Sequence, residues 1–283
     1  MTTRQPHQIF DRSAYRRRRT RKCSSDSDQF LVREAAEQLS ARLASINRSF
    51  TSALDLNSRK QSFEILRDAA QQWTRSGSDA PADVAADDEL LPFRDASFDL
   101  LTSVLSLHAV NDLPGTLVQF RRVLKPDGVF MAALFGGDTL HELRLAFTAA
   151  EAAALGGASP RVAPFADVRD LGGLLQRAGF ALPVADIERT TVRYREPMRL
   201  IADLRALGET NVLIQRRPNF LSRRLLAEMI SEYVQLFSDD QHRITATFDI
   251  VYLIGWAPDE SQPKPLRPGS AKTRLADVLK PRE

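Results

Sequence analysis

The sequence predicts an α/β protein built on a doubly wound, mostly parallel sheet. Strand-like apolar runs alternate with helical patterns through the first half of the chain, and polar residues follow the ends of those runs. Of the 283 residues, 43% are hydrophobic and 27% are charged, which is typical of a folded globular protein and excludes global disorder. We therefore expect one large domain with helical additions.

The elements begin with a helix over 30–46, because apolar residues recur there at helical spacing; Asp26 or Asp28 is its expected N-cap. A short apolar strand, TSALDL, follows at 51–56. Helical spacing returns in FEILRDAAQQW at 63–73. The next expected strand is FDLLTSV at 98–104, a buried type of run between turn residues.

An amphipathic pattern predicts a helix at 113–124, and the KPDG turn at 125–128 leads into a strand at 128–135. A helix over 138–155 is expected to start at Asp138 as N-cap and to end at Gly156.

The same pattern predicts a helix over 164–180, followed by a strand at 181–194. Two further helices are expected in an insertion at about 195–240, before a last strand at 245–257. The folded domain is thus expected to span 26–257, with a proline-rich tail at 258–283.

The N-terminal residues 1–25 form a basic arm, and we expect it to be solvated. The arm lacks the interleaved aromatic residues that stack on bases, so no specific nucleic-acid partner is expected. Its Arg- and Ser-rich composition also imitates a mitochondrial transit peptide, the less favoured interpretation. A single cysteine, Cys23, excludes an intrachain disulfide and indicates a reducing compartment. No apolar run is long enough for a transmembrane segment.

The run DDELLPFRDASFDLLTSVLSLHAVNDLPGTLVQFRRVLKPDGVF (87–130) resembles the class I S-adenosylmethionine-dependent methyltransferases. Further segments extend the resemblance over almost the whole chain: QIFDR (8–12), FGGDTLHELR (135–144), SPRVAPFADVRDLGGLLQRAGF (159–180) and YLIGWAPDESQPKPLRPGSA (252–271). Together they are similar to a methyltransferase-like family, methyltransferase type 11, that includes the mitochondrial complex I assembly factor 5 and its bacterial relatives.

The resemblance implies a Rossmann-like fold, S-adenosylmethionine as cofactor, and a methyltransferase that modifies a protein or small acceptor. It also implies a link to a respiratory complex I subunit as partner, and it leaves open protein-arginine hydroxylation, as in the mitochondrial member. Because QIFDR stands close to residue 1, the bacterial form and the cytoplasm are expected, with the mitochondrial matrix as the alternative.

Five residues are the candidate site. The resemblance places Asp55, Asn57, Asp87 and Asp88 around the cofactor, and His108 follows the fourth strand, where a histidine serves as general base near neutral pH. The alternative for His108 is a histidine that only hydrogen-bonds a loop.

The loop after the first strand departs from the family, because residues 57–62 contain no glycine, whereas the family uses glycine there for a tight turn. Arg59 and Lys60 bring bulk and positive charge to this loop instead. In the family the second strand ends in an acid that bridges the cofactor ribose, whereas here the interval 62–80 looks shortened and supplies only TRSGSDAP. A non-catalytic assembly or binding protein with a degenerate site is therefore the alternative hypothesis.

An iron site from His108, Asp138 and His141 is conceivable on paper. The N-cap interpretation of Asp138 explains that residue better, so no metal is expected.

Overall fold

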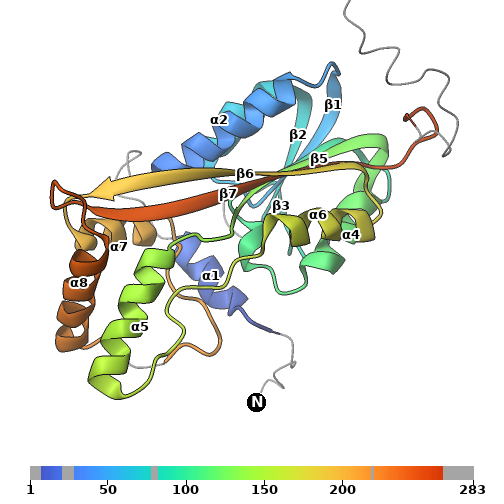
Figure 1. The fold of residues 1–283 in the computed structure, drawn as a ribbon. Helices are drawn as coiled ribbons and strands as arrows, with labels where there is room; N and C mark the ends of the chain where they lie inside the picture. Colours follow the sequence, from blue (N-terminus) through green and yellow to red (C-terminus); the bar gives the residue numbers. More distant parts are fainter. Residues whose placement is uncertain (1–7, 21–28, 78–81, 218–219, 264–283) are drawn as a thin grey trace, which may run out of the picture.

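The computed structural model describes residues 8–20, 29–77, 82–217 and 220–263. Within them a seven-stranded sheet has the order β3-β2-β1-β4-β5-β7-β6 (Figure 1). The strands are β1 (Phe50–Leu56), β2 (Ala70–Gly77), β3 (Val84–Ala85), β4 (Phe98–Val104), β5 (Leu124–Gly136), β6 (Ala181–Tyr194) and β7 (Ile244–Trp256). Strands β1 to β5 pair in parallel, and β7 is antiparallel to both β5 and β6. The predicted doubly wound, mostly parallel sheet is confirmed.

Helices cover both faces of this sheet (Figure 1). On one face lie α2 (Phe30–Ala44) and α3 (Lys60–Leu66), and on the other lie α4 (Leu113–Val123) and α6 (Val168–Arg177). Three further helices, α5 (His141–Leu155), α7 (Pro197–Ala206) and α8 (Arg223–Phe237), extend the first of these layers. Both layers are apolar cores, so the central strands β4, β5 and β7 are buried on both faces, as the inner strands of such sheets generally are.

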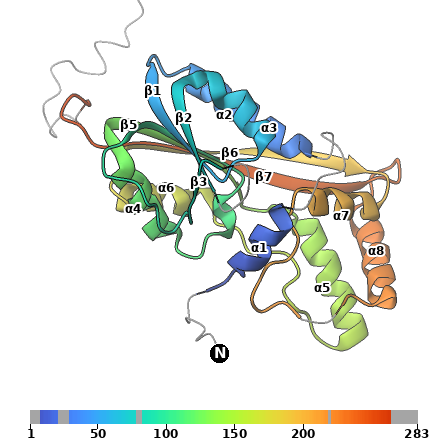
Figure 2. The ribbon, with the colours of Figure 1, turned by 180° about the vertical axis from the view of Figure 1, so that it is seen from behind.

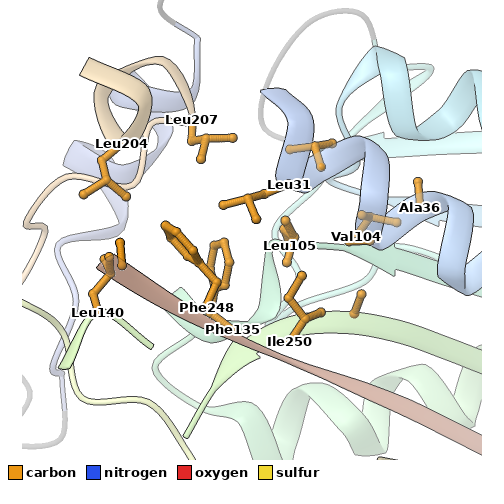
Figure 3. Close-up of a cluster of buried hydrophobic side chains, with 14 of the residues drawn as sticks. Leu31, Ala36, Val104, Leu105, Phe135, Leu140, Leu204, Leu207, Phe248 and Ile250 are labelled. Atoms are coloured by element: carbon orange, nitrogen blue, oxygen red, sulfur yellow. The ribbon is translucent and has the colours of Figure 1, made fainter. Parts of the chain in front are cut away.

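The larger core joins the sheet to α2 and to the end of α7. Figure 3 shows Leu31 of α2 and Leu207 just after α7 directed toward Phe135 and Phe248 of the sheet. This cluster lies beyond the end of β4, whose last residue, Val104, belongs to the same core. It therefore fixes α7 relative to the strand ends where a ligand of this fold is expected.

The helix predicted at 63–73 is wrong beyond Leu66. After a short 3₁₀ turn the chain becomes β2 at Ala70, which pairs in parallel with β1 through Ala53 opposite Trp73. Helical spacing there competes with the hydrogen bonds of a parallel ladder, and the ladder prevails because tertiary pairing overrides local propensity. The second strand is therefore present, and the interval is not shortened at the expense of a strand.

The predicted N-cap at Asp138 is also wrong. Helix α5 begins at His141, its N-cap position is Leu140 with φ 54°, and no side chain caps it. The Asp138 carboxylate instead accepts a hydrogen bond from Arg189 at 3.0 Å. Asp26 and Asp28, the expected caps of α2, lie outside the described residues.

The N-terminal arm is not solvated where the structure describes it. Residues Arg12–Arg19 form helix α1, whose N-cap Asp11 accepts from the backbone N–H of Ala14 at 2.9 Å. Ala14 and Tyr15 are buried, and α1 lies beside α5 and α7 (Figure 2). An apolar face among the arginines docks the helix, so the expectation of a solvated arm is wrong for this segment.

No helix in the described part of the chain is both long and apolar enough to cross a membrane.

Candidate functional site

The sheet order changes direction between the neighbouring strands β1 and β4. Strands β2 and β3 lie beyond β1, and β5 lies beyond β4. Ligands of open α/β sheets bind outside the carboxyl ends of the strands at such a switch point. Asn57 follows β1 and Leu105 follows β4, with φ of 50° and 48°. Both residues turn the backbone sharply, so their carbonyl groups leave the sheet ladder at this crevice.

Asn57 links three strand ends. Its backbone N–H donates to Ser76 of β2 at 2.8 Å, and its side-chain amide donates to Asp88 at 2.5 Å. A Cβ added to Gly77 would lie 2.8 Å from the Asn57 Oδ1 atom, so the end of β2 passes too close to this loop for a side chain. The left-handed turn that glycine gives other members is made here by asparagine, a residue that tolerates it.

Asp87 and Asp88 follow β3 and differ in environment. Asp88 is only 3% exposed, and burial raises its pKa, with Arg12 and Asn57 acting in the opposite direction. The side chain of Asp87 is 38% exposed and pairs with Arg12 at 2.7 Å and with Arg16. Although burial acts in the opposite direction, these two guanidinium groups lower the pKa of Asp87. Asp88 thus contacts Asn57, and α1 supplies the counter-charges of both acids.

Asp55 lies inside the sheet rather than on the rim, at 1% exposure. Thr102 of β4 donates to its carboxylate at 3.2 Å, and the Nε atom of Arg75 lies 3.9 Å away. Burial raises the pKa of Asp55 to about 6, against the hydrogen bond from Ser58 and the charge of Arg75. Its contacts support the loop after β1, and direct cofactor contact stays a prediction.

His108 lies in a 3₁₀ turn just after β4, and its side chain is 5% exposed. Its Nε2 atom is 2.9 Å from the Glu209 carboxylate. The other ring nitrogen, Nδ1, is buried and has no hydrogen-bond partner in the described part of the chain. Rings of Tyr15, Phe135 and Phe165 pack around it at centroid distances of 6.1, 5.0 and 6.1 Å.

Sequence reasoning missed Glu209. It stands just after the end of α7, where Gly208 adopts φ 73° and the Glu209 N–H bonds back to Leu204 at 2.8 Å. A glycine at a helix end was the one signal in the sequence, and it predicts where the helix stops but not what the next side chain contacts. Although burial acts in the opposite direction, His108 and Arg19 lower the pKa of Glu209, so it is an anion beside the histidine.

Arg19 of α1 was also missed, and it bridges the crevice. Its Nη1 atom donates to the carbonyl of Leu105 at 2.8 Å, and its Nη2 atom donates to the carbonyl of Asn57 at 2.5 Å. The Ser58 hydroxyl makes a second bridge, because it accepts from the Val104 N–H at 3.2 Å. Arg59, which the sequence placed at the crevice, instead donates to the carbonyl of Leu207 at the end of α7.

Among the described residues no three histidine, cysteine, aspartate or glutamate side chains are arranged to hold a metal ion. In particular, Asp138 pairs with Arg189, and His141 contacts the Asp138 carbonyl at 3.1 Å.

The strand order, the polar rim at the switch point and the acid after β3 define the methyltransferase class of α/β fold. Residues 43–132 match the family described as Methyltransferase domain, whose class uses S-adenosylmethionine as cofactor. Over 78% of its length the chain also superposes on 98% of the YcgJ protein of Bacillus subtilis, with a TM-score of 0.54 and 13% sequence identity. By fold and by domain the protein thus has the architecture of the class I methyltransferases, as the sequence predicted.

A relative with higher sequence identity shows to which family the chain belongs. Over 296 residues the chain is 37% identical to "Arginine-hydroxylase NDUFAF5, mitochondrial" of Danio rerio, covering 99% of this chain and 92% of the relative. It belongs to the NDUFAF5 family. A second relative, "Malonyl-[acyl-carrier protein] O-methyltransferase" of Laribacter hongkongensis, is 40% identical over 63% of this chain and 58% of its own length.

The residues at the rim fit one end of S-adenosylmethionine better than the other. Asp87 and Asp88 present carboxylate oxygens suited to the hydroxyl and amino groups of an adenosine. At the place where the methionine end lies in this class, the loop contains no glycine, and Ser58 and Arg19 join β1 to β4. The acids after β3 therefore suit the adenosine end, whereas Ser58 and Arg19 occupy the junction of β1 and β4, where the methionine end is expected.

Proposed function

We propose that this protein is a methyltransferase that modifies a protein or small-molecule acceptor bound beside His108. The observation that carries the proposal is the meeting of two groups of side chains at the switch point of the sheet. Asn57, Asp87 and Asp88 form the cofactor side, and the pair of His108 and Glu209 forms the acceptor side. Open α/β sheets bind their ligands at this place.

On the cofactor side, Asp87 and Asp88 accept hydrogen bonds from the adenosine end. Asn57 orients Asp88 through the 2.5 Å hydrogen bond from its side-chain amide. Asp55, buried within β1, supports the loop after that strand. The bound cofactor supplies an electrophilic methyl group. The positive charges of Arg12 and Arg16 keep the Asp87 carboxylate ionised and hence able to accept hydrogen bonds.

On the acceptor side, His108 acts as general base. Glu209 accepts a hydrogen bond from Nε2–H, and the neutral ring then carries its lone pair on Nδ1. That atom takes the proton that an acceptor nucleophile loses on methylation. The rings of Tyr15, Phe135 and Phe165 exclude water around it. Glu209 positions the histidine and touches no acceptor.

The family and the composition of the chain support a proposal for the acceptor and the compartment. The similarity to complex I assembly factor 5 supports a respiratory complex I subunit as partner. The single cysteine supports a reducing compartment such as the bacterial cytoplasm. The relative named arginine-hydroxylase makes hydroxylation of a protein arginine the second candidate function, and the guanidinium already seated at the crevice favours it.

Calorimetric titration with S-adenosylhomocysteine tests the cofactor side. Saturable binding is expected, and Asp87→Asn should weaken it by about tenfold to a hundredfold, since a charged hydrogen bond contributes that much. Asp95→Asn is the matched control, because Asp95 is an exposed acid that pairs with Arg122 away from the rim. Equal affinity for both variants contradicts the assignment of Asp87. The absence of any binding favours the non-catalytic assembly protein.

Intact-mass measurement separates the two reactions. The protein, with S-adenosylmethionine, is incubated with purified hydrophilic subunits of complex I. Methylation replaces one acceptor hydrogen by a methyl group and so adds one methylene. Hydroxylation adds one oxygen atom and needs dioxygen and a two-electron reductant, which a parallel incubation supplies. His108→Ala should abolish the gain of a methylene, and a gain of oxygen would instead support the second candidate.

A further inference from the structure

The crevice between β1 and β4 is built around a guanidinium group. Three acceptors from three parts of the chain meet Arg19: the carbonyl of Asn57 after β1, the carbonyl of Leu105 after β4, and the hydroxyl of Tyr15 on α1, at 2.5, 2.8 and 3.0 Å. Backbone carbonyl groups that leave a sheet ladder still need hydrogen-bond donors. The planar fork of Arg19 donates to both carbonyls at once, which a lysine ammonium does less well.

Negative charge also selects a cation here. The positive charge of Arg19 acts on three carboxyl groups around the crevice. It helps to lower the pKa of Glu209, and it partly offsets the rise that burial causes in the pKa of Asp55 and of Asp88. The guanidinium carbon of Arg19 lies 5.4 Å from the centre of the Tyr15 ring, a cation–π distance. Carbonyl oxygens, carboxylates and an aromatic face all attract a flat cation and repel an anion.

We propose that this crevice is a guanidinium-binding site, with Arg19 as its internal ligand. An alkylguanidinium occupies it when Arg19 is absent. The site coincides with the methionine end of the cofactor site, so Arg19 and the cofactor compete, and α1 must withdraw Arg19 before that end is filled. Only this last consequence rests on the proposed function.

Chemical rescue tests the site. Arg19→Ala should lower the melting temperature, and millimolar ethylguanidinium should raise it again saturably, by about 2–4 °C for a protein of this size. Ethylammonium at the same ionic strength should not, because it lacks the fork. Arg17→Ala is the matched control, since Arg17 is an exposed arginine on the same helix. Should Arg19→Ala not fold, Arg19→Gln keeps part of the side chain and takes its place.

The outcomes are decisive in either direction. A rise in melting temperature that is confined to the Arg19 variant and to ethylguanidinium supports the site. No rise, or an equal rise in the wild type and in Arg17→Ala, overturns it. This measurement needs no cofactor and no activity, so it stands even if the proposed function fails.

Competition has its own test. S-adenosylhomocysteine should bind Arg19→Ala about tenfold more tightly than the wild type, as expected for the removal of a competing charged contact. Ethylguanidinium should weaken that binding. Weaker binding to the variant than to the wild type would mean that α1 holds the ligand, and the competition would be refuted.

Discussion

Asp55 is predicted to make the protein less stable as the pH rises from about 4 to about 6. The carboxyl group is buried between β1 and β4, where burial raises its pKa from 3.8 to about 6. The folded state therefore binds its proton more tightly than the unfolded chain does. The stability that this proton contributes is fully present below the unfolded pKa and is lost as the pH rises through about 6.

The magnitude follows from the two pKa values. Each pKa unit corresponds to about 1.36 kcal/mol, so the rise from 3.8 to about 6 corresponds to about 3 kcal/mol in the free energy of unfolding. Asp55→Asn removes the titration and keeps the shape of the side chain. The amide faces donors from Ser58 and Thr102, which adds a constant cost but no dependence on pH.

The assay is urea unfolding of the wild type and of Asp55→Asn at several pH values. The difference in unfolding free energy, wild type minus variant, should fall by about 3 kcal/mol in all between about pH 3 and about pH 7, with about 2 kcal/mol of this fall between pH 4 and pH 6. Asp95→Asn controls for the loss of one carboxylate. A difference that rises with pH would mean that the charge of Arg75 outweighs burial, and the reasoning would be refuted.

Three further substitutions test the contacts around the site. Gly77→Ala should lower the unfolding free energy by about 1–3 kcal/mol, since the new Cβ would lie 2.8 Å from the Asn57 Oδ1 atom; an unchanged melting curve would contradict this. Glu209→Gln should change the ¹⁵N shifts of the His108 ring, because Nε2 no longer bonds to a carboxylate; identical shifts in both proteins would rule out the pair. Tyr233→Phe should cost about 1 kcal/mol in urea unfolding, because its hydroxyl donates to a carbonyl of β7 at 2.9 Å, and no loss would show that this bond is not stabilising.

Much of the fold could be predicted from the sequence because its strongest patterns are local. The strands at 98–104 and 181–194 have the predicted bounds, since turn residues flank the first and the second is a long regular run. Strand β2 was missed because only its pairing with β1 identifies it. A pattern within one segment carries no information on which ladder that segment joins.

The candidate site was likewise predicted only in part from the sequence. Asn57, Asp87 and Asp88 were placed together because strands of a parallel sheet end at one rim. The roles of Arg19 and Glu209 could not be predicted, because each reaches the site from a helix whose docking depends on distant side chains. The basic run alone predicts a solvated arm. In the structure Tyr15 is buried, and the acids after β3 pair with the arginines of α1.

The most direct test of the whole account is a crystal structure of Arg19→Ala grown with S-adenosylhomocysteine. The account predicts the adenosine at Asp87 and Asp88 and the amino-acid end between the carbonyls of Asn57 and Leu105. A ligand bound elsewhere, or a crevice that stays closed by Ser58 with no ligand at a saturating concentration, would contradict it.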